Sequence, residues 1–447
     1  MTDRSTTLIE KKSQLVQYFT DGIKKLDQIK IGVEHEKFLF NRKDLKRINY
    51  DKIKKLFEIL KSKGWELSFE KEKLIGLKRK NQKITTEPGF QYELSGAPFR
   101  NIHSVCSENS DHFNELKEIF NLASITTSSI AYDPFNKLDD IPKSPKERYK
   151  IMTAEMPKGG KLSLDMMYKT AGIQINFDYI SEKDFEKKFK IGNCLAPLTI
   201  ALFANSPFFE NNLSGYLSYR GKVWQETNRG GIMPIAFEQV SFEKYIDYVI
   251  NYPILFLKKD KKYHSPNGQT FNDFLNGNLS FYKGKKPTLE DFENHLGTIF
   301  TEVRLKQVIE FRSLDTCNFG CICNGPSFFT GLIYGSLEET YEIIKNWKKE
   351  EVIEAYLNAP KQGLNTLLSN KKLIDWGRIF LTLSKKGLEK RNELNKSGKN
   401  ETIYLKHIEE IIKKKKTRAE MLIEQFNKTK NLNFLVNNDE NFSYSGF

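Results

Sequence analysis

Cysteine is scarce in this sequence, and long apolar runs are missing from it. The 447 residues include five cysteines, which are Cys106, Cys194, Cys317, Cys321 and Cys323. An odd count, in a chain whose first residues are polar and lack a secretory pattern, favours free thiols in a reducing compartment. No stretch approaches the roughly eighteen consecutive apolar residues of a transmembrane helix. The sequence therefore predicts a soluble, cytoplasmic protein without a membrane partner.

Acidic residues are outnumbered by basic ones, which give a formal net charge of +14. Such a charge suits a nucleic-acid-binding protein, because lysine and arginine contacts to phosphates dominate that affinity. The excess is mostly lysine scattered through helix-like segments such as residues 51–64, without an arginine-rich arm. Lysines in this pattern are typical of solvated helix faces. Nucleic-acid binding is therefore the weaker alternative, and no nucleic-acid partner is expected.

Glycine-rich phosphate loops of the Walker or Rossmann type are also absent, as are internal repeats. The most informative stretch is instead a β-like run over residues 32–40. Alternation along a strand places Glu34 and Glu36 on one face and Val33 and His35 on the other. A solvated strand would explain this pair, whereas a buried pair would need a cation to offset the cost of desolvation.

Three further runs repeat this pattern of an apolar back and a polar front. They are residues 84–96 with Gln91, Glu93 and Ser95, residues 169–178 with Gln174, Asn176 and Asp178, and residues 302–312 with Glu302, Arg304, Glu310 and Arg312. A half-solvated sheet also alternates, but it would favour lysine and threonine over acid and amide pairs. The four runs together predict an α+β protein with one antiparallel sheet and a polar pocket on its front.

The spread of these strands predicts a single catalytic unit over residues 1–345. A capping box at Thr7 and Glu10 predicts a helix before the first strand, continuing in helical spacing towards Leu26. Apolar stripes such as the one that contains Trp376 and Phe380 predict that residues 346–447 form a helical region packed on the core.

Carboxylates that converge with arginine and amide side chains suit Mg²⁺ bound to the phosphates of a nucleotide. Phosphoryl transfer needs cationic groups to neutralise charge on the moving phosphoryl oxygens, and Arg312 is a candidate for this task. A plain ion pair with a neighbouring acid is the alternative for Arg312. Residue types do not separate a kinase from an enzyme that phosphorylates a carboxylate before an amine attacks it.

Five motifs in order resemble those of glutamate-cysteine ligases of the plant and proteobacterial type. They are Gly-Val-Glu-His-Glu-Lys-Phe at 32–38, Glu-Pro-Gly-Phe-Gln-Tyr-Glu-Leu-Ser-Gly at 87–96, Leu-Asp-Met-Met at 164–167, Ala-Leu-Phe-Ala-Asn-Ser-Pro at 201–207 and Glu-Val-Arg-Leu-Lys at 302–306. The resemblance implies a glutamine-synthetase-like fold, in which an antiparallel sheet forms a bowl with helices outside. It also implies that ATP, L-glutamate and L-cysteine give γ-glutamylcysteine, the first step of glutathione biosynthesis, through a γ-glutamyl phosphate. A γ-glutamyl ligase with another amine acceptor is the nearest alternative.

The resemblance also implies roles for individual residues. Those expected to bind Mg²⁺ are Glu34, Glu36, Glu93 and Glu310, with Glu87 as a weaker member. Those expected to act on the substrates are Gln174, Asn176 and Arg220 in binding, and Arg148 and Arg312 in catalysis.

The sequence departs from the family pattern at three places. Phe90 stands where the family has a second glycine after Glu-Pro-Gly, and Thr301 stands where a proline precedes Glu302. The stretch after Trp224 is short, which leaves a role for Arg229 open.

Overall fold

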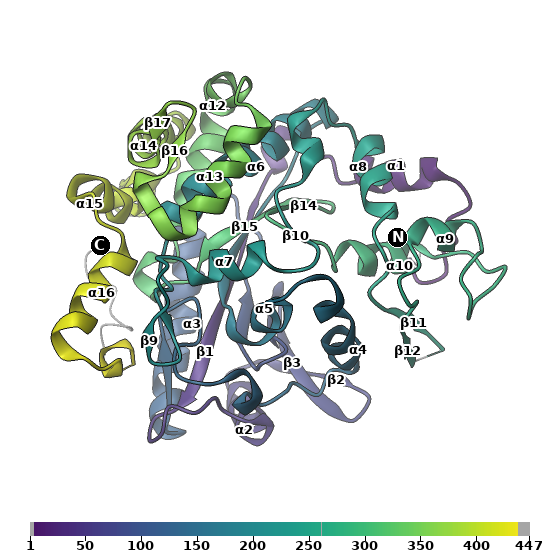
Figure 1. The fold of residues 1–447 in the computed structure, drawn as a ribbon, viewed down its shortest axis with the longest axis horizontal. Helices are drawn as coiled ribbons and strands as arrows, with labels where there is room; N and C mark the ends of the chain where they lie inside the picture. The colour runs from purple at the N-terminus through teal and green to yellow at the C-terminus, as the bar shows by residue number, and fades with distance from the viewer. Residues whose placement is uncertain (1–3, 261, 437–447) are drawn as a thin grey trace.

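The computed structural model describes residues 4–260 and 262–436. Its centre is a nine-stranded antiparallel sheet in the order β14-β15-β7-β1-β5-β4-β3-β2, with β6 paired to the far half of β1. Helices surround this sheet (Figure 1). The predicted α+β class and the bowl-like antiparallel sheet are confirmed. The strands are β1 (Ile31–Asn41), β2 (Glu66–Glu70), β3 (Lys73–Arg79), β4 (Gln82–Thr86), β5 (Tyr92–Ser95), β6 (Ile125–Ser128), β7 (Gly172–Phe177), β14 (Val303–Leu305) and β15 (Ile309–Asp315).

Helices and short hairpins make up the rest of the regular structure. The helices are α1 (Lys12–Thr20), α2 (Tyr50–Ser62), α3 (Ile102–Leu122), α4 (Glu147–Glu155), α5 (Ser163–Lys169), α6 (Glu182–Leu202), α7 (Tyr219–Gln225), α8 (Phe242–Ile250), α9 (Phe271–Leu275), α10 (Leu289–Leu296), α11 (Asn324–Thr330), α12 (Leu337–Ile344), α13 (Lys349–Gln362), α14 (Leu373–Arg391), α15 (Lys406–Lys414) and α16 (Arg418–Thr429). The short strands are β8 (Phe208–Phe209), β9 (Asn212–Leu213), β10 (Gly230–Gly231), β11 (Leu257–Lys259), β12 (Lys262–His264), β13 (Phe300–Thr301), β16 (Leu367–Leu368) and β17 (Lys371–Lys372).

The register of the sheet brings the polar residues of four strands to one face. Glu36 lies opposite Glu93 across the β1–β5 ladder, and Glu34 lies opposite Gln174 across β1–β7. Glu310 is likewise paired with Asn176. Side chains alternate along each strand, so the same register sends the apolar residues to the back.

The back of the sheet is closed by α6. Gly192 of this helix lies so close to β14 and β15 that a Cβ there would meet Val303 and Phe311 at 2.7 Å. Phe311, Ile173 and Ile175 are buried in the main core beneath it. The absence of a side chain at Gly192 therefore lets the helix seat closely on the strands that carry Glu310 and Arg312.

Two predicted elements differ in the structure. Residues 302–312 form a hairpin, β14 and β15, in which Arg304 pairs directly with Glu310. The first helix begins at Lys12, because Leu8 forms a β-bridge with Thr288 in place of a helical turn. Sequence spacing alone could not show that Leu8 pairs with Thr288, which lies far along the chain.

The expectation of five free thiols is wrong. Disulfides join Cys106 to Cys323 and Cys317 to Cys321, and Cys194 is the free cysteine. The Cα atoms of each pair lie 6.0 Å and 6.1 Å apart, which is within the range that a disulfide spans. The first pair depends on α3 lying beside the start of α11, a tertiary arrangement that residue counts do not reveal.

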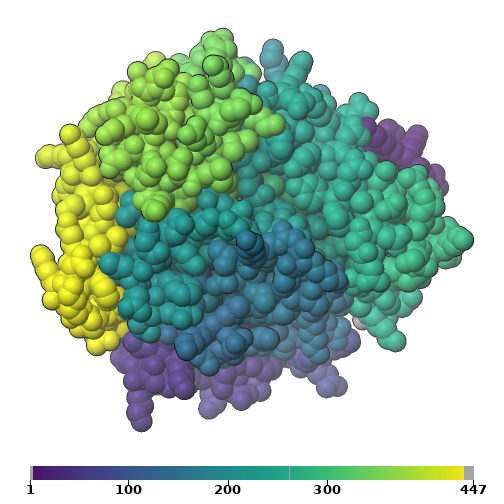
Figure 2. Space-filling view, viewed as in Figure 1, coloured from purple at the N-terminus to yellow at the C-terminus, as the bar shows by residue number. Residues whose placement is uncertain are grey.

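The C-terminal helices form one edge of the molecule, drawn in light green to yellow in Figure 2, where their surface continues into that of the rest. Glu401 is buried and ties this edge to α3, since its Oε1 accepts from the amide of Ile102 at 2.6 Å and its Oε2 from Arg391 at 3.2 Å. Within the residues the structure describes, none of the helices is both long and apolar enough to cross a membrane.

Candidate active site

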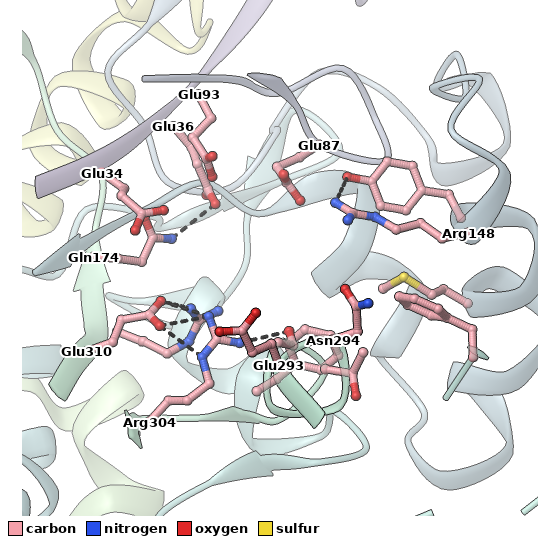
Figure 3. A pocket seen from close by; sticks show the side chains of 17 residues that line it. Glu34, Glu36, Glu87, Glu93, Arg148, Gln174, Glu293, Asn294, Arg304 and Glu310 are labelled. Carbon is pink, nitrogen blue, oxygen red and sulfur yellow. Dashed lines mark hydrogen bonds and ion pairs between the residues drawn. The ribbon is translucent and has the colours of Figure 1, made fainter. Parts of the chain in front are cut away.

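A cavity opens on the polar face of the sheet, and its walls carry opposite charges (Figure 3). Carboxylates of β1, β5 and the turn before β5 form one wall. Arginines of β14 and β15 face them, and an arginine of α4 lies on a third side. The lining residues are Glu34, Glu36, Glu87, Glu93, Arg148, Tyr149, Met152, Gln174, Phe256, Glu293, Asn294, Gly297, Thr298, Phe300, Arg304, Glu310 and Arg312.

The carboxylate wall is held by hydrogen bonds from the neighbouring strands. Glu36 accepts from the backbone amide of Gly172 at 2.6 Å and from Nε2 of Gln174 at 3.1 Å. Glu93 accepts from the hydroxyls of Thr85 and Ser95, each at 3.2 Å. Neutral donors of this kind orient the carboxylates but do not cancel their charge.

Two carboxyl groups on this wall, those of Glu36 and Glu93, have raised pKa values. Burial, and then the nearby charge of Glu87, raise the pKa of Glu36 to about 7. Burial and the charges of Glu87, Glu34 and Glu36 raise the pKa of Glu93 well above its usual range. Like charges held together out of water disfavour ionisation, and a cation would relieve this cost.

The carboxylate on the opposite wall, Glu310, is already paired with cationic side chains. Arg304 grips Glu310 with two hydrogen bonds, Nε to Oε2 at 2.8 Å and Nη2 to Oε1 at 2.9 Å. Arg312 forms an ion pair with Oε1 of the same carboxylate. Although burial opposes it, the charges of Arg304, Arg312 and Lys306 hold the pKa of Glu310 far below its usual range. Both oxygens of Glu310 are thus engaged.

Arg304 also fixes a second part of the cavity. Its Nη1 donates to the carbonyls of Gly297 and Ile299 at 2.9 and 3.0 Å. These carbonyls belong to the segment that follows α10, and Gly297 and Thr298 of that segment line the cavity. One guanidinium therefore joins the hairpin to the wall formed by α10.

The third side of the cavity comes from the start of α4. Arg148 projects into it and donates to the hydroxyl of Tyr149 at 3.3 Å. Lys146, two residues earlier, is buried and donates to the carbonyl of Thr86 at 2.8 Å, directly before Glu87. Burial and the charge of Arg148 lower the pKa of Lys146 to about 8.

The turn that carries Glu87 is unusually constrained. Gln91 does not face the cavity as expected, because its amide is used inside the turn, where it accepts from Gly89 at 2.9 Å and donates to Met167 and Thr170 at 3.0 Å. Phe90 has a φ of 58°, in the left-handed region that favours glycine. A glycine would meet this backbone requirement without strain, whereas Phe90 meets it at a cost.

Two predicted binding residues lie outside the lining. Asn176 donates to Oε1 of Glu34 at 2.9 Å and so lies directly behind the cavity wall. Arg220 of α7 is buried and donates to the carbonyl of Arg312 at 3.0 Å, with Asp315 at 3.8 Å. Both residues support the residues that line the cavity in this structure.

The sequence did not assign several lining residues. Arg304 had a usable signal, because it shares a face with Glu302, but its partner depends on the hairpin register. Glu293 and Asn294 lie on α10, far from the recognised motifs, and had no such signal.

Three buried polar atoms near the cavity have no hydrogen-bond partner among the described residues. They are Oε1 of Gln174, Nε of Arg220 and Nε of Arg312. Buried polar atoms in native proteins are normally satisfied by protein groups or by ordered water.

The residues fit a divalent cation in their chemistry. Within the part of the chain that the structure describes, no three carboxylates, thiols or imidazoles converge tightly enough to hold an ion as they stand. Glu34, Glu36, Glu87 and Glu93 nevertheless line one cavity, where burial and neighbouring carboxylates raise the pKa values of Glu36 and Glu93. Oxygen ligands of this type are those that Mg²⁺ prefers.

Comparison with known proteins fits this arrangement. Residues 30–437 match the family described as Glutamate-cysteine ligase family 2 (GCS2). The chain belongs to this family. It is therefore a ligase, as predicted.

Curated relatives cover most of the chain. The chloroplastic glutamate–cysteine ligase of Solanum lycopersicum is 40% identical over 421 residues, which cover 93% of this chain and 79% of the relative. Glutamate–cysteine ligase A, chloroplastic, of Oryza sativa subsp. japonica is 40% identical over 418 residues, 92% of this chain and 84% of the relative. A crystal structure of glutamate–cysteine ligase from Francisella tularensis in complex with AMP matches with a TM-score of 0.53 at 15% identity, covering 91% of this chain and 86% of that one. That likeness shows the fold.

The expectation of a cytoplasmic protein is wrong by the same comparison. The relatives from Solanum lycopersicum, Nicotiana tabacum, Oryza sativa and Arabidopsis thaliana are all chloroplastic, not cytoplasmic. The absence of a secretory pattern could not have distinguished these two compartments, because neither requires one.

Proposed function

We propose that this protein uses ATP to join the γ-carboxylate of L-glutamate to the amino group of L-cysteine, giving γ-glutamylcysteine, ADP and phosphate. A carboxylate resists amines because oxide is a poor leaving group. Transfer of the γ-phosphoryl group of ATP to the γ-carboxylate gives γ-glutamyl phosphate. The amine then attacks the acyl carbon and phosphate departs. The observation that carries this proposal is the cavity itself, in which a carboxylate wall faces an arginine wall.

The carboxylate wall would hold Mg²⁺ through Glu34, Glu36 and Glu93, with Glu87 as an additional ligand. A Mg²⁺ ion held there would neutralise negative charge on the phosphate oxygens of ATP. Glu310 would contribute an oxygen only after one of its two arginines turns away, since both are engaged. We propose that Arg312 makes this turn when the phosphoryl group arrives, which exchanges one anionic partner for another.

Arg312 and Arg148 would neutralise the phosphoryl and carboxylate oxygens during transfer. A planar guanidinium can grip two oxygens at once, which an ammonium cannot. Gln174 lines the cavity beside Glu36 and would help to bind glutamate there. Asn176 and Arg220 would not contact the substrates themselves. Asn176 would hold Glu34 in place, and Arg220 would hold the main chain of Arg312.

We also propose that residues 1–345 carry the catalytic residues and that residues 346–447 pack on them. The buried contact of Glu401 with the start of α3 supports close packing of the two regions.

An acceptor screen tests the proposed function. The purified protein is given ATP, Mg²⁺ and glutamate with cysteine, with other amines, or with hydroxylamine, and ADP is measured with the γ-glutamyl product. We expect ADP release to require glutamate, turnover to be fastest with cysteine, and hydroxylamine to give γ-glutamyl hydroxamate. Faster turnover with another amine would show that this amine, and not cysteine, is the acceptor. Release of ADP without any γ-glutamyl product would contradict the ligation proposal.

A further inference from the structure

Tyr356 of α13 reaches the strands that carry the arginine wall, although it lies beyond residue 345. Its hydroxyl donates to Oε1 of Glu302 at 2.6 Å, and both residues are buried. A buried carboxylate is costly without a hydrogen bond or an opposite charge. The phenol therefore helps to fix how Glu302 lies at the start of the hairpin.

Glu302 in turn holds the main chain of Arg312. The β15–β7 ladder is irregular between Phe311 and Leu314, so Arg312 falls where regular pairing is interrupted. The amide of Arg312 donates instead to the carbonyl of Glu302 at 2.9 Å, and its carbonyl accepts from Arg220 at 3.0 Å. The backbone position of Arg312 thus depends on two contacts outside the β15–β7 ladder.

Tyr356 supports both of these contacts. Besides its bond to Glu302, its carbonyl accepts from Nε2 of Gln225 at 2.5 Å. Gln225 is the last residue of α7, the helix that presents Arg220. The hydroxyl of Tyr356 therefore fixes the residue that holds the amide of Arg312, and its carbonyl fixes the helix that holds the carbonyl.

We propose that Tyr356 is a positioning residue for Arg312, acting through Glu302 and α7. Tyr356 does not line the cavity and needs no contact with substrate. A residue of the C-terminal helical region would then complete the active site of the first 345 residues. This inference rests on the proposed role of Arg312 in phosphoryl transfer.

The first test replaces Tyr356 with phenylalanine, which removes the hydroxyl and keeps the ring. We expect kcat to fall about tenfold or more, because small displacements of a catalytic group can cost about a hundredfold in rate. The KM values for ATP and glutamate should stay within about twofold. The matched control is Tyr404→Phe, which removes another hydroxyl from a buried tyrosine of the same region. The hydroxyl of Tyr404 lies 3.0 Å from Nδ1 of His103, and neither residue lines the cavity. Wild-type kcat in Tyr356→Phe, or equal losses of kcat and thermal stability in both variants, would overturn the inference.

A second measurement tests the route through Glu302. Glu302→Gln keeps an acceptor for the phenol and removes the buried charge, so it should retain most of kcat. In that background Tyr356→Phe should lower kcat by less than it does in the wild type, because it no longer leaves a buried carboxylate without its hydrogen bond. Equal costs in the two backgrounds would show that Tyr356 does not act through Glu302.

Arg312→Lys separates this inference from the proposed function. Full turnover in Arg312→Lys would remove the proposed role of Arg312 and the inference with it. A large loss in Arg312→Lys beside normal turnover in Tyr356→Phe would overturn the inference alone.

Discussion

Two glutamates on the same face of the sheet, Glu36 and Glu310, have opposite electrostatic environments. Both line one cavity, where Glu310 is buried and Glu36 is half-buried. Burial and then the charge of Glu87 raise the pKa of Glu36 to about 7, although the amide of Gly172 and the more distant charges of Arg220 and Arg312 oppose this rise. Glu310 lies between Arg304 and Arg312, which hold its pKa far below its usual range. The charge balance of the cavity is therefore unequal from one wall to the other.

This difference distinguishes a metal-binding role from an arginine-holding role, which residue type alone does not separate. A carboxylate that lacks a counter-charge favours the arrival of a cation, whereas one with two guanidinium partners stabilises those partners. Glu36 is thus suited to Mg²⁺, and Glu310 is suited to holding arginines ready for an anion. The metal role of Glu310 stays a prediction that depends on the departure of an arginine.

The largest expected effect is on the arginine wall. Arg312→Lys should lower kcat by about 10²–10³, the loss typical when one preorganised donor to a transition-state anion is removed. Lysine keeps the charge but cannot grip two oxygens with a planar group. Steady-state kinetics with saturating ATP and glutamate measure the effect, and exposed Arg378→Lys is the control. Normal turnover in Arg312→Lys would show that charge alone suffices on this wall.

The next effect distinguishes the two glutamates directly. Glu36→Gln should raise the Mg²⁺ concentration for half-maximal activity by about 10–100-fold, a range seen when support of a metal site is lost. Glu310→Gln should instead lower kcat with a smaller change in Mg²⁺ dependence, because it frees both arginines. If the two variants exchanged these phenotypes, the assignment of the walls would be reversed.

The metal-free protein should also reveal the raised pKa of Glu36 in its stability. The folded-state pKa of about 7 exceeds the unfolded value of 4.5, so the folded state binds more protons between these pH values. The free energy of unfolding should therefore fall as pH rises from about 4.5 to about 7. At pH 8, Mg²⁺ at a hundred times its Kd should restore about 2.7 kcal/mol. Thermal unfolding with and without EDTA measures this, and Glu36→Gln should flatten the pH dependence.

The smallest expected effect concerns the turn that carries Glu87. Phe90→Gly and Phe90→Ala both remove the buried ring, but only glycine adopts a φ of 58° without strain. The glycine variant should be more stable than the alanine variant by about 1 kcal/mol, the reverse of their order in regular structure. Urea unfolding of the two variants measures the difference, and a more stable alanine variant would refute backbone strain at this turn.

Alternation in the sequence predicted the polar face well. Glu34, Glu36, Glu93 and Gln174 line the cavity as expected, because a period of two fixes the face of a strand whatever its partners. The same argument could not give the register. Pairing of Arg304 with Glu310 depends on the turn that divides residues 302–312, and that turn lacks a strong local signal.

Contacts between distant segments explain the remaining differences. Arg220 was assigned to substrate from a motif, but the fold places α7 beneath Arg312, where its guanidinium meets a carbonyl. The disulfide between Cys106 and Cys323 and the β-bridge of Leu8 likewise depend on partners more than 200 residues away. Local patterns contain no information on such partners.

The transfer of heavy oxygen tests the central claim most directly, namely that the two walls together form an acyl phosphate. Glutamate labelled with ¹⁸O in its γ-carboxylate is turned over with ATP, Mg²⁺ and cysteine, and the released phosphate is examined by mass spectrometry. The account predicts one ¹⁸O atom in each phosphate, because the carboxylate oxygen leaves with the phosphoryl group. Unlabelled phosphate during productive formation of γ-glutamylcysteine would contradict it.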